Sequence, residues 1–135
     1  ETLCCVMLDC NRFKQINDDY GHHMGDKALQ KVAEALRATF PGDTDLLFRI
    51  GGDEFAVFLR NAGTREAILK RARELIADFR QIPVTGDRYV SCSLGVVVAE
   101  SGEKDFERLY SHADEAMYEA KRKGKNQYAV YTMKN

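Results

Sequence analysis

The sequence lacks the features that would assign it to a membrane or to a nucleic-acid polymer. No apolar run approaches the roughly 20 residues that a bilayer-spanning helix needs, and no signal peptide opens the chain. Its 20 Lys and Arg are balanced by 21 Asp and Glu, so the formal net charge is −1 and no general basic field attracts a phosphate backbone. We therefore expect no nucleic-acid polymer and no direct membrane contact.

The four cysteines lack the spacing of a metal-binding motif. Three of them, Cys4, Cys5 and Cys92, lie in apolar stretches that are typical of strands, and Cys10 follows closely. Buried, reduced thiols are the expected state, because disulfides are rare in cytosolic proteins. We expect a cytoplasmic domain, whose parent protein could itself be anchored to a membrane.

The composition is that of one ordinary globular domain. The chain has 135 residues, of which 44% are hydrophobic and 30% charged, with no repeat, low-complexity segment or internal linker. It begins without Met, and strand-like residues follow almost at once. We therefore expect residues 1–135 to be a single domain cut from a longer multidomain protein.

Periodicity predicts a mixed fold of the order β-α-α-β-β-α-β-α-β. Short apolar or alternating runs predict strands, and apolar residues spaced three and four apart predict helices. The predicted strands are 3–8, 45–48, 55–59, 89–99 and 127–131, and the predicted helices are 12–17, 24–40, 64–79 and 105–122. Asn11 is expected to cap the first helix. This order predicts an α+β domain, with a central, mainly antiparallel sheet and helices packed on it.

The stretch from Arg49 to Phe55 joins two of these strands. Gly51-Gly52 predicts a tight two-residue hairpin turn, because glycine accepts the positive φ that such a turn needs. Two acids, Asp53 and Glu54, follow the turn directly. The local pattern alone favours an ordinary hairpin with solvated acids. Asp9, at the end of the first strand, is by the same local reasoning either a metal ligand or a helix-start residue.

Four segments together resemble the signature blocks of the GGDEF family. They are residues 9–14, 17–26, 49–55 and 113–126, and they occur in the family's order and spacing over essentially the whole chain. The resemblance implies a ferredoxin-like palm, as in nucleotide cyclases and polymerases, that makes cyclic di-GMP from two GTP. It therefore reverses the interpretation of the hairpin acids as merely solvated.

The resemblance implies a metal site at this hairpin. Asp9, Asp53 and the backbone carbonyl of Cys10 would be the ligands, and Glu54 a further ligand or catalytic assistant. Asp53 and Glu54 are the expected catalytic residues. Two Mg²⁺ or Mn²⁺ ions are expected per active site, because hard cations take oxygen ligands and neutralise a triphosphate.

The resemblance also implies which cations hold the phosphates. Lys14, Lys121 and Lys125 match phosphate-binding positions, beside a helix N-terminus that suits anions. The family often has Arg where Lys125 stands, so the bidentate contact of an arginine is lost there. Gly51 and Gly52 are expected to contact substrate. The neighbouring Arg122 and Lys123 are interpreted as solvated.

Asn17 and Asp26 are the expected base-binding residues. A carboxylate can accept both the N1–H and the exocyclic amine of guanine, whereas adenine offers no such pair of donors, so Asp26 favours GTP. The family pattern places His22 and His23 in the binding loop and gives them no part in catalysis.

The implied reaction needs two domains face to face, each holding one GTP, in a homodimer that can be transient. A covalently attached sensor domain is expected outside this chain. Two alternatives remain open: a catalytically silent GTP-binding regulatory module, and another nucleotidyl transferase with a palm-like sheet, which would not need Asn17 and Asp26.

Two positions depart from the family pattern. Asn11 replaces a frequent Asp, with little expected loss because that position is not a core metal ligand. Many members also carry Arg-x-x-Asp before the hairpin, as a product-binding inhibitory site. Here that stretch runs from Gly42 to Asp45, so the acid is present and the Arg is absent.

We therefore predict weak or absent feedback inhibition through that site. Cyclic di-GMP added at the start of an assay should leave the initial rate of its own synthesis nearly unchanged. The measurement is an inhibition curve at fixed GTP, and a curve in which low concentrations of cyclic di-GMP stop the reaction would contradict the prediction.

Overall fold

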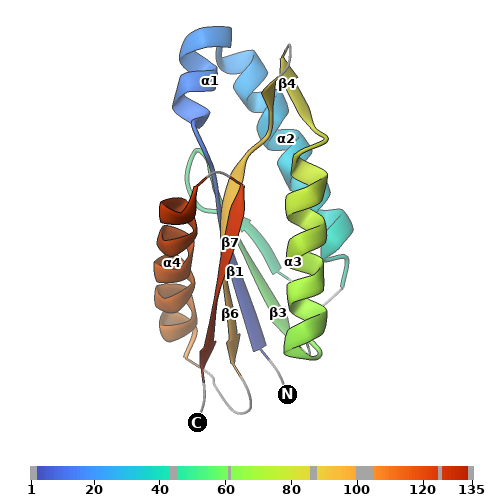
Figure 1. Cartoon of the computed structure of the whole chain (residues 1–135), viewed down its shortest axis with the longest axis vertical. Coiled ribbons are helices and arrows are strands. Elements are labelled where there is room, and N and C mark those ends of the chain that lie inside the picture. The colour runs from blue at the N-terminus through green and yellow to red at the C-terminus, as the bar shows by residue number, and fades with distance from the viewer. Residues whose placement is uncertain are drawn as a thin grey trace.

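The chain folds around a central five-stranded sheet with helices on both faces, shown as a computed structural model in Figure 1. The structure describes residues 3–42, 46–60, 62–85, 88–99, 105–124 and 126–133. Its elements in chain order are β1 (Leu3–Cys10), α1 (Phe13–Tyr20), α2 (His22–Thr39), β2 (Leu46–Arg49), β3 (Glu54–Arg60), α3 (Arg65–Phe79), β4 (Pro83–Thr85), β5 (Arg88–Tyr89), β6 (Cys92–Ala99), α4 (Phe106–Lys123) and β7 (Gln127–Met133).

The sheet confirms the predicted fold class. Its strand order is β2-β3-β1-β6-β7, and every neighbouring pair is antiparallel except β6 and β7. One detail of the prediction is wrong: the strand expected over 89–99 is two strands. β5 turns away to pair with β4 in a small separate hairpin, and β6 starts only at Cys92.

β1 is buried on both faces, as its unbroken apolar run predicts. Successive side chains of a strand point to opposite faces. Cys4, Val6 and Leu8 belong to the core beneath α2 and α3, whereas Cys5 and Met7 belong to the core beneath α4. Figure 1 shows α4 on one side of the sheet and α3 on the other. All four cysteines are buried and free of disulfides, as expected.

Gly95 on β6 lets α4 lie directly on the sheet. A Cβ at this position would come within 2.0 Å of the Ala113 carbonyl oxygen and 2.3 Å of the Met117 nitrogen, both backbone atoms of α4. Because backbone cannot move aside as a side-chain end can, only glycine fits here. The close approach fixes where α4 ends relative to the sheet.

The start of α1 differs from the prediction. The residue at the N-cap is Arg12, with φ 59° and ψ 28°, and no side chain caps the helix. Asn11 instead turns its amide to β6: its Nδ2 donates to Ser91 Oγ at 3.0 Å, and its Oδ1 accepts from Ser93 Oγ at 2.9 Å. The capping prediction for Asn11 is therefore wrong, because the hydroxyls of Ser91 and Ser93 satisfy its amide.

The hairpin between β2 and β3 exists, but its turn is not the predicted one. β2 ends at Arg49 and β3 begins at Glu54, so the connection spans residues 50–53 instead of two glycines. Neither Gly51 nor Gly52 is among the residues with positive φ. The Arg49 guanidinium closes the longer loop by donating from Nη2 to the Gly52 carbonyl at 2.7 Å.

Within the described part of the chain, no helix is long and apolar enough to cross a membrane.

Candidate active site

A cleft of about 470 Å³ opens where β1 ends, between the start of α1 and the end of α4. It brings together segments from both ends of the chain. The residues that line it are Asp9, Cys10, Asn11, Arg12, Phe13, Lys14, Asp53, Lys121 and Gly124. Five of them, Asp9, Cys10, Lys14, Asp53 and Lys121, were predicted from the sequence as site residues.

Asp9 lines this cleft at the end of β1. It continues the alternation of β1 onto the face that α4 covers, and its carboxylate Oδ2 accepts a hydrogen bond from Lys121 Nζ. Asp9 is only 7% exposed, and its Oδ1 is buried without a hydrogen-bond partner among the described residues. Glu54 is its cross-strand partner on β3. An ionised buried oxygen without a partner is a position that a cation would satisfy.

Three carboxylates share this small region. Burial, followed by the charge of Asp9, raises the pKa of Asp53. Burial and the charges of Asp9 and Asp53 likewise raise the pKa of Glu54. Burial acts to lower the pKa of Lys121, but the bond to Asp9 and the surrounding carboxylates raise it overall. The cluster therefore carries more negative charge than its single lysine offsets.

The loop that carries Asp53 is tied to β1 through the backbone. The Cys10 N–H donates to the Asp53 carbonyl at 3.0 Å, and the Ile50 N–H donates to the Glu54 carbonyl at 2.9 Å. A Cβ at Gly51 or Gly52 would meet no heavy atom within 4 Å. Packing therefore does not require the two glycines, which leave the loop bare on its open side.

The residues present fit a divalent cation. The orphaned Asp9 Oδ1 and the repelling carboxylates of Asp53 and Glu54 are oxygen ligands of the kind that Mg²⁺ prefers. Within the described residues, no three His, Cys, Asp or Glu side chains already form a metal-binding group. A complete set would therefore need backbone, water or substrate oxygens beside the carboxylates.

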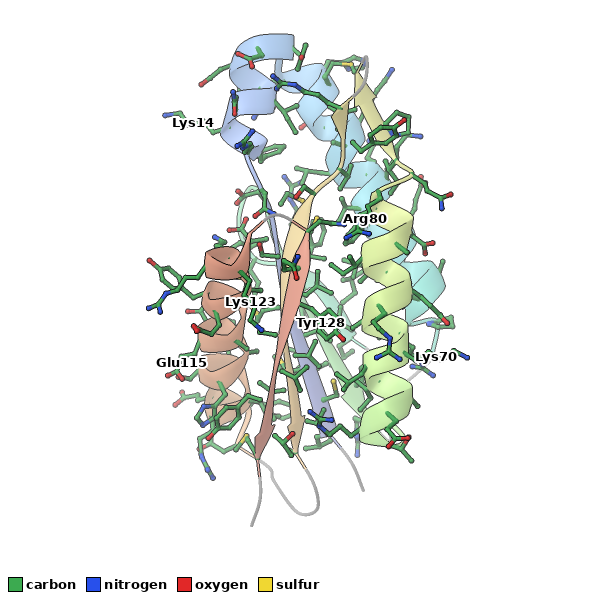
Figure 2. All side chains as sticks on the ribbon, in the orientation of Figure 1. Lys14, Lys70, Arg80, Glu115, Lys123 and Tyr128 are labelled. Atoms are coloured by element: carbon green, nitrogen blue, oxygen red, sulfur yellow. The ribbon has the colours of Figure 1, made fainter. Side chains whose placement is uncertain are left out.

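The predicted phosphate-binding residues are only partly placed. Lys14 is exposed on the first turn of α1 and extends outward from it (Figure 2). The first N–H groups of a helix have no partner within the helix, and the left-handed Arg12 before them forms the αL–αR turn that gathers N–H groups into an anion-binding concavity. Lys125 lies outside the described residues, as do residues 43–45 of the expected inhibitory stretch.

Neither base-binding candidate lines the carboxylate cleft. Asp26 lines a second cleft of about 420 Å³ between α2 and the hairpin, together with Leu29, Gln30, Ala33, Arg37, Leu47, Arg49 and Phe55. Asn17 is on α1, and its Oδ1 is buried without a hydrogen-bond partner in the described part of the chain. The stretch from Arg49 to Phe55 borders both clefts, since Asp53 lines one and its two ends line the other.

The basic residues at the end of α4 have different surroundings. Lys121 contacts Asp9 in the cleft, whereas Arg122 faces solvent, 3.7 Å from Glu119 and 5.8 Å from the centre of the Tyr118 ring. Lys123 is exposed as well. The position on the helix therefore distinguishes the cleft lysine from its neighbours.

Asn126 is a structural residue for which the sequence predicts no separate role. It is buried, with φ 55°, and follows the end of α4. Its Oδ1 accepts from the Cys92 N–H at 3.2 Å and its Nδ2 donates to the Ile76 carbonyl at 2.9 Å. It thereby ties the segment after Lys121 to β6 and α3. An Asn shortly after a helix-ending glycine is the one sequence signal for such a left-handed position.

These features define the class: an α+β domain with a palm-like sheet and an acidic cleft at one end of its central strands. The chain belongs to the GGDEF family, because a match to the family described as "Diguanylate cyclase, GGDEF domain" covers residues 1–127.

Curated relatives and solved structures agree with that family. The chain is 36% identical to diguanylate cyclase DosC of Escherichia coli K12 over 132 residues, covering 96% of this chain and 28% of DosC. It is 39% identical to diguanylate cyclase DgcS of Shewanella oneidensis over 133 residues, covering 96% of this chain and 42% of DgcS. The chain therefore spans less than half the length of these relatives.

Among solved structures, the chain resembles the active GGEEF domain of a diguanylate cyclase from Vibrio cholerae. The TM-score is 0.88 at 30% identity, covering 99% of this chain and 85% of that one. The GGDEF domain of PA1120 from Pseudomonas aeruginosa gives a TM-score of 0.85 at 31% identity, covering 99% and 84%.

The raised pKa of Asp53 predicts a pH-dependent stability difference. Folding raises the pKa of this carboxyl, so the ionised form is less favourable in the folded state than in the unfolded state. The free energy of unfolding therefore falls as pH rises from the unfolded-state pKa through the folded-state pKa. Asp53→Asn should therefore increase the free energy of unfolding at pH 7 without added metal, and the gain should vanish below about pH 3, where the wild-type carboxyl is protonated in both states.

Denaturant unfolding at the two pH values measures this difference. Glu119→Gln, on the exposed side of α4, is the matched control and should show no such pH-dependent gain. A variant Asp53→Asn that is less stable than wild type at pH 7, or changed equally at both pH values, would contradict the prediction.

Proposed function

We propose that the domain is a diguanylate cyclase that condenses two GTP into cyclic di-GMP and two pyrophosphates. The observation that carries the proposal is the gathering of the Asp9, Asp53 and Glu54 carboxylates near Lys121. Of these, Asp9, Asp53 and Lys121 line a cleft that also contains the start of α1. Membership of the family supports the reaction class, and relatives named diguanylate cyclases match nearly the whole chain.

Asp9 and Asp53 would hold the metal, with the Cys10 carbonyl completing the protein ligands and Glu54 as a further ligand or catalytic assistant. Two Mg²⁺ or Mn²⁺ ions per site would neutralise the triphosphate and lower the pKa of the attacking 3′-hydroxyl. The excess negative charge of the cluster supports this assignment, because it disfavours the ionised form of Asp53 and Glu54 unless cations are near.

The cations and the backbone of the cleft would hold the phosphates. Lys121 is within hydrogen-bond contact of Asp9, and the cleft places it beside the N-terminal turn of α1 with Lys14. A helix N-terminus and lysines both attract phosphate oxygens. Bare Gly51 and Gly52 leave the open side of the loop accessible to substrate.

Base selection would fall to Asn17 and Asp26. Asp26 lines the cleft beside apolar Leu29 and Phe55, which suits a planar base with hydrogen-bond donors on one edge. The buried Oδ1 of Asn17 is an acceptor without a donor among the described residues. Guanine offers an N1–H and an exocyclic amine as neighbouring donors, and adenine lacks this pair. A nucleotidyl transferase without base selection would have no use for this arrangement.

Cyclisation of two nucleotides would need two copies of the domain. One cleft holds one set of carboxylates, so a second GTP must be presented by a second domain in a homodimer. We propose that an attached sensor domain in the parent protein governs this encounter, since the relatives are more than twice as long as this chain.

The test is to incubate the protein with GTP and Mg²⁺ and to identify the products by mass. Wild type should release cyclic di-GMP, and Asp53→Ala should lower the rate by about a hundredfold or more, because it removes one of the two central carboxylates. Lys123→Ala, exposed on the same α4 that carries Lys121, is the matched control and should keep the wild-type rate. Undiminished synthesis by Asp53→Ala would contradict the assignment.

The second candidate is a catalytically silent GTP-binding module. The chain is 36% identical over 129 residues to a protein named cyclic di-GMP phosphodiesterase PdeR of Escherichia coli K12, covering 19% of that protein. That name gives an activity other than a cyclase, and this observation favours the second candidate. In the same assay such a module would bind GTP and release no product.

A further inference from the structure

Gly25 on α2 is pressed against the side chain of Asn17 on α1. A Cβ at Gly25 would lie 1.8 Å from Asn17 Oδ1, 2.9 Å from its Cγ and 3.0 Å from Phe13 Cε1. Gly25 is buried and is not among the residues with positive φ, so its backbone conformation suits any residue. A glycine here therefore serves to leave space, and the Asn17 amide fills that space.

The corner between α1 and α2 holds these two residues together. The helices are joined by Gly21 alone, with φ 88°. The Gly21 N–H donates to the Asn17 carbonyl at 2.8 Å, and the Gly25 N–H donates to the Gly21 carbonyl at 3.3 Å. The backbone of Asn17 is thus fixed by the corner, and its side chain by contact with Gly25.

The Asn17 amide held in this way has an unsatisfied hydrogen-bond acceptor. Its Oδ1 is buried and has no hydrogen-bond partner among the described residues. Leaving a buried acceptor unpaired costs free energy unless a ligand supplies the donor. The next residue after Gly25 is Asp26, which lines the neighbouring cleft, so one turn of α2 carries both the space for Asn17 and the second acceptor.

We propose that Gly25 is a positioning residue for base recognition: the missing Cβ holds the Asn17 amide at the α1–α2 junction, where it selects guanine. The proposal rests on the proposed function, in which Asn17 contacts the base. Gly25 touches no reacting atom, so it governs the affinity for GTP and leaves the chemical step at the carboxylate cleft unchanged.

The direct test is Gly25→Ala. The new methyl group should displace the flexible end of Asn17 and leave the helices folded. We expect the KM for GTP, and the Kd for a non-hydrolysable GTP analogue measured by calorimetry, to rise about tenfold or more. The kcat should stay within about threefold of wild type, and the preference for GTP over ATP in binding should fall. Lys31→Ala, exposed on the same helix, is the matched control and should change none of these.

A double-mutant cycle separates positioning from loss of structure. Asn17→Ala alone should weaken binding of the analogue by a similar factor. Adding Gly25→Ala to Asn17→Ala should then cost less than about twofold, because no amide remains to be displaced. An equal loss in both backgrounds would show that Gly25 acts through helix packing alone and would overturn the proposal. Unchanged affinity in a folded Gly25→Ala variant would overturn it as well.

The cycle also distinguishes this proposal from the proposed function. If wild type does not bind the GTP analogue, or Asn17→Ala binds it as well as wild type does, base recognition by Asn17 fails and Gly25 has nothing to position. If Asn17→Ala weakens binding but Gly25→Ala does not, only the positioning role fails. Should Gly25→Ala not fold, refolding in the double variant would support the steric role, and failure of both variants to fold would overturn it.

Discussion

The contact between Asp9 and Lys121 is the interaction on which the rest of the site depends. It joins the first strand to the last helix, 112 positions apart in the chain. The contact exists because alternation along β1 turns Asp9 toward α4, and because Gly95 lets the backbone of α4 approach the sheet closely enough for its last turn to reach the strand end. A larger residue at position 95 would separate the two partners before any change in the site itself.

Several features of the site are unfavourable for the stability of the fold. Asp53 and Glu54 have raised pKa values beside Asp9, one oxygen of Asp9 has no partner in the described part of the chain, and Arg12 adopts a left-handed conformation between strand and helix. Such strain collects at functional sites, where a ligand relieves it. All of these features lie in or beside one cleft, and the neighbouring strands β1 and β6, buried on both faces, keep them in place.

The sequence predicted the family, the fold class and most of the cleft, because four motifs and the apolar periodicity are properties of neighbouring residues. The errors arose where partners distant in the chain decide the geometry. Asn11 bonds to Ser91 and Ser93, some 80 residues away, instead of capping α1. The hairpin turn is a local exception, because the Arg49 side chain closes the longer loop on Gly52, three residues along the chain. The packing of Gly25 on Asn17 is likewise visible only once the helices are placed, although both residues lie in one motif.

In the proposed function, Asp9 and Asp53 hold a divalent cation for GTP. The most direct measurement is an electron paramagnetic resonance titration of Mn²⁺ in the presence of a non-hydrolysable GTP analogue. Wild type should bind Mn²⁺ tightly at the site, Asp9→Asn should lose about tenfold or more in affinity, and Asp78→Asn on α3 should match wild type. Mn²⁺ binding by Asp9→Asn that equals wild type in affinity and number of ions would contradict the account.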